Sequence, residues 1–276
     1  ALPSPELTLP VTAGAITVIY NLGGATGHLN LSGAVLAEIY LGRITHWNDP
    51  AIAVNNSGRG LPSTTILTVH RSDPAGTTYV LTDFLARQSP AWATGPGKGI
   101  SVSFPSGPLQ EAVHGNSALL TYVETTPNTL GYSDLTDVLA SSSPPSYAAI
   151  LNPAHEFVVP TLASTQSAVN DASSAQQFPA SSGDWYNVSL VDAPGASDYP
   201  LATLVYAYAY AATDHGFAPS PAKSAVLVGW LHWVLTTGQA DAAPNDYAGL
   251  PTALLNVDEA GLSTMTFNGA SIPFCT

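Results

Sequence analysis

Hydrophobic and polar positions change their period along the chain, and each change predicts a strand followed by a helix. Residues 66–69 form a short apolar run that predicts a strand, and Pro74 and Gly76 then mark a tight turn. After the turn, apolar residues recur at helical spacing, namely Val80, Leu81, Phe84 and Leu85. We therefore expect a strand, a turn and an amphipathic helix that begins near Gly76.

Three other segments carry helix signals. Residues 32–41 follow the N-cap residue Ser32 and stop at Gly42. Residues 220–237 open with a Ser-Pro pair, and their predicted apolar face consists of Leu227, Trp230, Leu231, Val234 and Leu235. Residues 110–123 are expected to be helical in their first part.

Three segments carry strand signals. Residues 201–211 alternate tyrosine with alanine, and this period of two predicts a strand with one small face. Residues 7–22 predict two strand pieces broken at Ala13-Gly14, because glycine inside a strand often marks a bend. Residues 126–134 predict a loop that leads into a short strand. Strands that alternate with helices indicate the α/β fold class.

Composition narrows the range of partners and locations. The chain has 276 residues, enough for one large domain or two lobes, and only 9% of them are charged. A formal net charge of −13 argues against nucleic acid or an anionic membrane as partner. Cys275 is the only cysteine, so no internal disulfide can form. No apolar run reaches the length of a membrane span, and the low lysine content suits a secreted or extracellular setting.

The candidate chemistry lies in the strand–turn–helix segment. The first N–H groups of a helix suit a small oxyanion, and Arg71 adds a cationic fork just before the turn. Asp73 could hold that guanidinium in place or accept a proton from a ligand oxygen. The alternative is an ordinary Arg71–Asp73 surface pair in a common α/β unit.

Other chemistries lack their usual patterns. The seven histidines show no metal-ligand spacing, and with one cysteine a structural zinc site is not expected. His70, Ser72 and Asp73 are too close in sequence to form a triad, because neighbours in a strand and its turn point in different directions. The chain has no GxSxG, Walker A or GxGxxG motif. We therefore expect no enzymatic activity, cofactor or metal.

Six segments together resemble the PstS family, the substrate-binding proteins of phosphate ABC transporters. They cover nearly the whole chain in family order: LPVTAGAITVIYNL, LSGAVLAEIYLGRITHWNDPAIA, VHRSDPAGTTYVLTDFLA, NTLGYSD, YPLATLVYAYAY and VGWLHWVLTTGQADAAPNDYAGLP. The resemblance implies a type II periplasmic-binding-protein fold, with two lobes joined by crossing strands and an anion held in the cleft. One lobe is expected at 15–200 and the other, incomplete, at 1–14 and 201–276.

The resemblance also implies ligand residues. Arg71 is expected as the clamp, Asp73 as its carboxylate partner and an acceptor for protonated phosphate, and Gly76 and Thr77 as donors. Ala75 stands where the family usually has serine, so we expect only its backbone N–H to remain as a donor. Loss of one hydrogen bond to a charged ligand costs about 1.5–3 kcal/mol, which weakens binding by about one or two orders of magnitude.

The family's N-terminal region has no counterpart at the start of this sequence, and this leaves two functional hypotheses. The first is non-enzymatic phosphate binding in an interlobe cleft for ABC-type uptake, with an ABC permease as partner and a periplasmic or secreted location. The second is a structural or assembly module that has lost phosphate binding. We expect another polypeptide, a proteolytic partner or a neighbouring copy of this chain to complete the second lobe. The alternative is a remodelled lobe that no longer binds phosphate.

Overall fold

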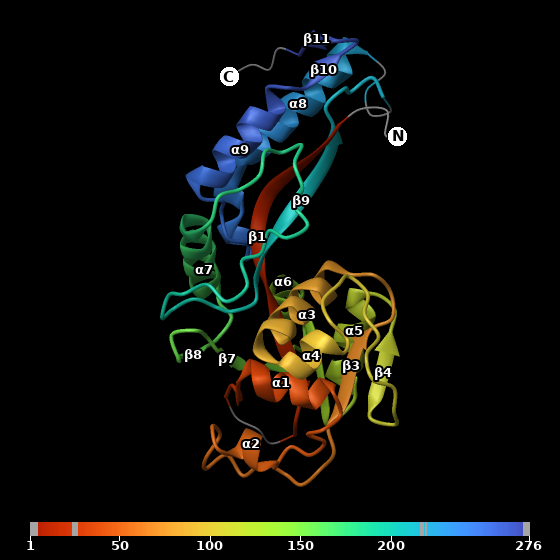
Figure 1. Cartoon of the computed structure of the whole chain (residues 1–276), viewed down its shortest axis with the longest axis vertical. Helices are drawn as coiled ribbons and strands as arrows, with labels where there is room; N and C mark the ends of the chain where they lie inside the picture. Colours follow the sequence, from red (N-terminus) through yellow and green to blue (C-terminus); the bar gives the residue numbers. More distant parts are fainter. Residues whose placement is uncertain (1–4, 24–26, 216–217, 219, 273–276) are drawn as a thin grey trace.

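The computed structural model describes residues 5–23, 27–215, 218 and 220–272, and Cys275 lies outside this range. Two lobes lie one above the other in Figure 1, and the long strand β1 (Glu6–Asn21) runs through both. The expected break at Ala13-Gly14 is wrong. Both residues pair with β9 in register, and the irregularity lies earlier, between Pro10 and Thr12. The two lobes therefore share the single strand β1.

The strands form a mixed main sheet and two small sheets. Their bounds are β2 (Asn30–Leu31), β3 (Leu67–Arg71), β4 (Gln110–Val113), β5 (Thr129–Asp134), β6 (Ser146–Tyr147), β7 (Ala149–Leu151), β8 (Phe157–Val158), β9 (Ala202–Tyr210), β10 (Thr266–Phe267) and β11 (Ala270–Ser271). In the first lobe the order is β4-β3-β5-β1-β6, with β3 parallel to β4 and β5 and with β1 antiparallel to β5. In the second lobe the other half of β1 pairs antiparallel with β9.

Helices cover these sheets. Their bounds are α1 (Gly33–Tyr40), α2 (Pro50–Ala53), α3 (Gly76–Gln88), α4 (Pro90–Thr94), α5 (Asn116–Thr125), α6 (Leu135–Ala140), α7 (Leu162–Ala175), α8 (Pro221–Leu235), α9 (Thr252–Leu262) and the 3₁₀ turns η1 (Thr237–Asp241) and η2 (Ala243–Asn245). The predicted caps of α1 and α8 are confirmed, because Ser32 and Ser220 accept hydrogen bonds from the first turns of these helices.

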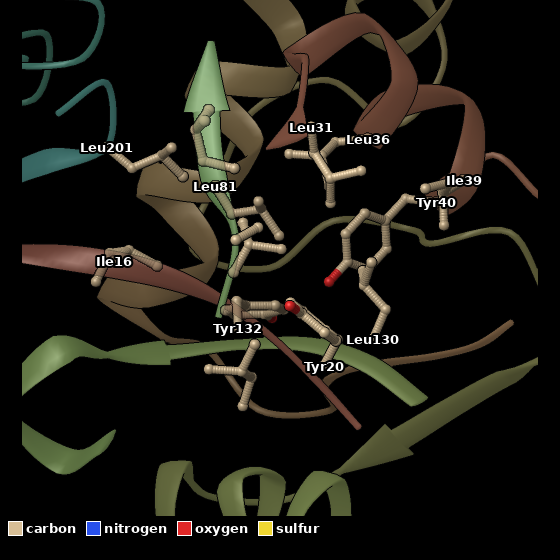
Figure 2. Packing of buried hydrophobic residues seen from close by; sticks show 14 of the residues in the cluster. Ile16, Tyr20, Leu31, Leu36, Ile39, Tyr40, Leu81, Leu130, Tyr132 and Leu201 are labelled. Carbon is tan, nitrogen blue, oxygen red and sulfur yellow. The ribbon is translucent and has the colours of Figure 1, made fainter. Parts of the chain in front are cut away.

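The first core lies around β1, β3 and β5 (Figure 2). Alternate side chains of β5 point to opposite faces, so Tyr132 packs near Tyr40 of α1, with ring centroids 6.5 Å apart, while Gly131 faces α5. Gly33 allows α1 to approach α3, because a Cβ there would lie only 2.8 Å from Cζ of Phe84. This packing holds the second half of α3 against α1.

The second core surrounds the first half of β1 and the alanine face of β9. Leu7, Leu9 and Ala209 are buried there with residues from α7, α8 and α9. The expected lobe boundaries, 15–200 against 1–14 with 201–276, remain a prediction about domains. The packing differs from them at α7, since Ala168 and Val169 belong to the second core.

Two local expectations need correction. Residues 110–113 form strand β4 rather than the start of a helix, because they pair in parallel with β3, and the helix begins only at Asn116. On α8 the expected apolar face is misplaced by part of a turn. The buried positions are Ser224, Val228, Leu231 and Leu235, whereas Trp230 is 55% exposed.

Candidate oxyanion site

The predicted strand–turn–helix segment is confirmed, and a buried tyrosine holds it in place. Strand β3 ends at Arg71 and α3 begins at Gly76. The Tyr132 hydroxyl accepts a hydrogen bond from the Arg71 N–H at 3.0 Å and shares a second one with Thr78 Oγ1 at 2.7 Å. The core of the first lobe thus fixes both ends of the turn.

Asp73 orients Arg71, as one of the two readings of the sequence proposed. Its Oδ1 accepts from Arg71 Nε at 2.7 Å and from the Gly115 N–H at 3.0 Å, and its Oδ2 accepts from Arg71 Nη2. The Arg71 guanidinium and then the Gly115 N–H hold the pKa of Asp73 well below its usual range. The same pairing raises the pKa of Arg71. Asp73 occupies the side of the guanidinium fork, so the end formed by Nη1 and Nη2 is left for a ligand.

The N-terminus of α3 has no side-chain cap. Ala75 is the N-cap residue and has no hydroxyl to bond the first turn. Among the described residues, no acceptor lies within hydrogen-bonding reach of the N–H groups of Gly76, Thr77 and Thr78. Three donors at the positive end of a 13-residue helix therefore remain for a ligand.

The expected role of Ala75 is wrong in one respect. Its N–H donates to the carbonyl oxygen of Ile100 at 2.8 Å, so this group is not available to an anion. The bond ties the loop that follows α4 to the turn. Ala75 contributes to the site only as part of its wall.

An open cavity of about 330 Å³ lies at this turn, next to the first residues of α3. Arg71, Ala75, Gly76 and Thr77 line it, together with the first residues of β9. Thr77 is 8% exposed, and its Oγ1 is buried without a hydrogen-bond partner. A buried hydroxyl that lacks a partner is costly, and a ligand oxygen in the cavity would satisfy it.

Nothing in the sequence indicated that Asn116 and Asp134 also line this cavity. Asn116 Nδ2 donates to Asp134 Oδ2 at 3.1 Å and also to Asp137, while Asn116 Oδ1 is buried without a partner. Burial and then the nearby Asp137 raise the pKa of Asp134 to about 6, although Arg71 opposes the shift. Because β3 and β5 are parallel neighbours, their carboxyl ends bring Arg71 and Asp134 to one edge of the sheet.

Comparison with known proteins gives the family. A model of the PBP superfamily domain matches residues 5–237. The phosphate-binding protein PstS of Pasteurella multocida is 32% identical over 259 residues, which are 94% of this chain and 71% of that protein. The chain belongs to the PstS family. The PstS of Methanocaldococcus jannaschii is 34% identical, over 89% of this chain and 64% of that protein.

Solved structures of phosphate-binding proteins share the fold of this chain. A high affinity periplasmic phosphate-binding protein bound with phosphate matches with a TM-score of 0.71 and 20% identity, over 98% of this chain and 77% of that chain. The phosphate-binding protein from Stenotrophomonas maltophilia matches with a TM-score of 0.66 and 18% identity, over 96% of this chain and 73% of that chain. The expected type II periplasmic-binding-protein fold is confirmed.

The described residues include no helix that is long and apolar enough to cross a membrane. In the same part of the chain, no three His, Cys, Asp or Glu side chains are grouped so that they could hold a metal ion.

Proposed function

We propose that this chain binds inorganic phosphate, without catalysis, in the cavity at the start of α3. The observation that carries the proposal is the buried, unpaired Thr77 hydroxyl beside three free N–H groups of the same helix. Arg71 lines the same cavity. The Thr77 hydroxyl and the helix N–H groups have no acceptor of their own, and Arg71 adds a positive charge beside them, which is the arrangement that a small tetrahedral anion requires.

The binding energy must come from short-range contacts. The chain carries a net charge of −13, so an anion approaches against the long-range field. Salt screens that field beyond about 8–10 Å, whereas hydrogen bonds in the cavity act at contact distance. Phosphate affinity should therefore rise with ionic strength over the range in which the distant acidic charges dominate.

Selection of protonated phosphate over sulfate requires an acceptor in the cavity, and Asp134 fits that role better than Asp73. The two oxygens of Asp73 already accept from Arg71 and Gly115, and Asp73 does not line the cavity. Asp134 lines the cavity together with Arg71, and the positive charge of Arg71 favours its ionised form. An ionised Asp134 accepts a hydrogen bond from a P–OH group and repels a fully ionised anion.

The family context supports a role in uptake. We place the chain as a substrate-binding protein that delivers phosphate to an ABC permease, in the periplasm or outside the cell. The relatives that support this are named phosphate-binding protein PstS. Each relative is matched over only part of its length, so the transport role is a proposal about the whole protein.

Isothermal titration with phosphate, and with sulfate for comparison, tests the proposal. Wild type should bind phosphate at micromolar concentration or tighter. Arg71→Ala should weaken binding about 100-fold or more, because two hydrogen bonds to a charged group are worth roughly 3–6 kcal/mol. Arg43→Ala is the matched control, since Arg43 forms an exposed pair with Glu38 away from the cavity. Folded wild type that gives no heat with phosphate contradicts the proposal.

A second candidate, an assembly module completed by another chain, is favoured by one surface. Among the described strands β9 pairs only with β1. On α8 an apolar stripe is exposed at i, i+4 and i+7, with Val226 73%, Trp230 55% and Trp233 45% exposed. Sedimentation of the purified chain tests it, because concentration-dependent association lost in Trp230→Ser supports the module, and a monomer at all concentrations rejects self-assembly.

A further inference from the structure

A second cavity adjoins the oxyanion cavity, and the proposed binding of phosphate gives it no role. It has a volume of about 220 Å³ and lies between α3, β9 and the segment 185–191. The two cavities share Gly76, Thr203 and Leu204 in their walls. A molecule held by its phosphate at the N-terminus of α3 can therefore extend along α3 into the second cavity.

The second cavity has aromatic walls from both lobes. Tyr79 of α3 and Tyr186 meet edge to face, with ring centroids 5.7 Å apart and planes at 69°. Tyr206 and Tyr208 of β9 also line the cavity, with ring centroids 6.3 Å apart, and Tyr208 is 60% exposed. These are the tyrosines whose alternation with alanine marks β9 in the sequence. Apolar and aromatic walls favour a flat apolar group over a second charged one.

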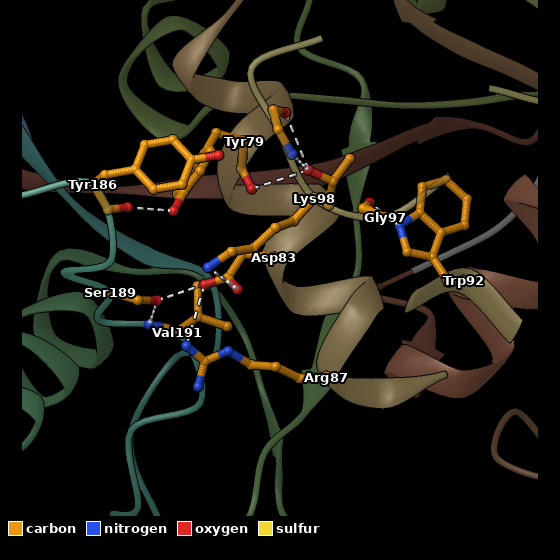
Figure 3. Close-up of polar contacts among 11 residues, drawn as sticks. Tyr79, Asp83, Arg87, Trp92, Gly97, Lys98, Tyr186, Ser189 and Val191 are labelled. Carbon is orange, nitrogen blue, oxygen red and sulfur yellow. Dashed lines mark hydrogen bonds and ion pairs between the residues drawn. The ribbon is translucent and has the colours of Figure 1, made fainter. Parts of the chain in front are cut away.

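Polar contacts between α3 and the segment 185–191 fix the shape of this cavity (Figure 3). The Tyr79 hydroxyl donates to the Tyr186 carbonyl oxygen at 2.6 Å, and Ser189 Oγ donates to Asp83 Oδ2 at 2.7 Å. Both bonds join α3 to the segment that closes the cavity. The walls are thus held in position before any ligand arrives.

The one carboxylate in the wall is compensated. Asp83 is buried and lies 3.2 Å from Arg87 Nη2 and 3.4 Å from Lys98 Nζ (Figure 3). Burial alone would raise the pKa of Asp83, but the Ser189 hydrogen bond and the positive charge of Arg87 outweigh it and lower the pKa. An ion pair of this kind keeps the cavity from repelling a phosphorylated ligand.

We propose that the combined site takes a phosphate monoester whose organic part is a single aromatic ring. The phosphate would occupy the cavity at Arg71, Gly76 and Thr77, and the ring would lie among Tyr79, Tyr186 and Tyr206. The size of the second cavity sets the ligand class. A cavity of about 150 Å³ holds benzene, whereas drug-sized ligands fill about 300–1,000 Å³. A single ring therefore fits in the second cavity.

This inference rests on the proposed phosphate site, and the test separates the two. Isothermal titration of the wild-type chain would use inorganic phosphate, methyl phosphate, phenyl phosphate and phenol. Methyl phosphate is the reference, because it has the ester oxygen without the ring. Phenyl phosphate should bind at least about tenfold tighter than methyl phosphate, from burial of one ring face and edge. Phenol alone should bind weakly, since it lacks the anchoring anion.

Two variants test where the ring lies. Tyr186→Ala removes an exposed wall, and Val188→Trp places a large side chain in the cavity. Each should abolish the advantage of phenyl over methyl phosphate and leave inorganic phosphate affinity unchanged. Val54→Trp is the control for a new surface tryptophan, because Val54 is 72% exposed and lies outside both cavities. Circular dichroism confirms that each variant is folded.

Three outcomes overturn the inference. If phenyl phosphate binds no tighter than methyl phosphate while inorganic phosphate binds, the ring site is wrong and the phosphate site stands. If the advantage of phenyl phosphate persists in both Tyr186→Ala and Val188→Trp, the ring lies elsewhere. If no phosphorylated ligand binds folded wild type, the phosphate site has failed and the ring site with it.

Discussion

Asp258 in α9 provides a sharp test of the second core. Its side chain is fully buried, and neither carboxyl oxygen has a hydrogen-bond partner. Burial without compensation raises the pKa of Asp258 to about 8 from its ordinary value of 3.8. In the unfolded chain the group ionises near its ordinary value. The folded state therefore holds a proton that the unfolded state releases, and stability falls as pH rises from about 4 to about 8.

The magnitude follows from the two pKa values. Between pH 5 and pH 8 the free energy of unfolding should fall by about 3.5 kcal/mol on account of Asp258 alone. In Asp258→Asn the side chain is nearly the same size and does not titrate, so this part of the pH dependence should disappear. Near pH 5 the two proteins should differ little, and at pH 8 the variant should be the more stable.

Urea unfolding at pH 5, 6.5 and 8, followed by circular dichroism, measures the effect. The quantity to compare is the free energy of unfolding of Asp258→Asn minus that of wild type at each pH, because other titrating groups cancel in this difference. Asp241→Asn serves as control, since Asp241 is exposed on the same lobe. A difference that stays constant from pH 5 to pH 8 would refute the assignment of Asp258 as a buried, neutral acid.

Two further variants address the oxyanion cavity. Ala75→Ser adds a hydroxyl at the N-cap of α3 and should tighten phosphate binding about tenfold by titration; a higher melting temperature with unchanged affinity would instead show that the serine only caps the helix. In wild type, sulfate affinity should fall as pH rises through about 6, because Asp134 then becomes negative. Asp134→Asn should remove this fall and bind sulfate about tenfold tighter at pH 7.5, and an unchanged pH profile would exclude Asp134 from the site.

The sequence predicts the strand, turn and helix around Arg71 and Gly76 well because the determinants of this segment are local. Gly76, the apolar spacing of α3 and the short distance from Arg71 to Asp73 all lie within one unit of structure. The fate of the Ala75 N–H is not local, since its acceptor is the carbonyl oxygen of Ile100 in a later loop. Asp134 likewise joins the cavity only because β5 lies next to β3 in the sheet.

The element errors have the same origin. Residues 110–113 are compatible with a helix on their own, and parallel pairing with β3 makes them a strand. Trp230 fits an apolar helical pattern, but the second core takes Val228 and Leu231 from the neighbouring face of α8 instead. Periodicity indicates that a helix has an apolar side, whereas the choice between two apolar sides depends on what packs against it.

Strand β1 has a consequence for the order of events during synthesis. Its second half pairs with β5 within the first lobe, but its first half waits for β9, because Leu7 pairs with Ala209 about 200 residues later. At about 5–20 residues per second, the ribosome needs roughly 10–40 s to supply that partner. During this interval the first lobe can fold while an apolar strand end projects from it unpaired. This strand end is where a chaperone or a premature contact between nascent chains would act first.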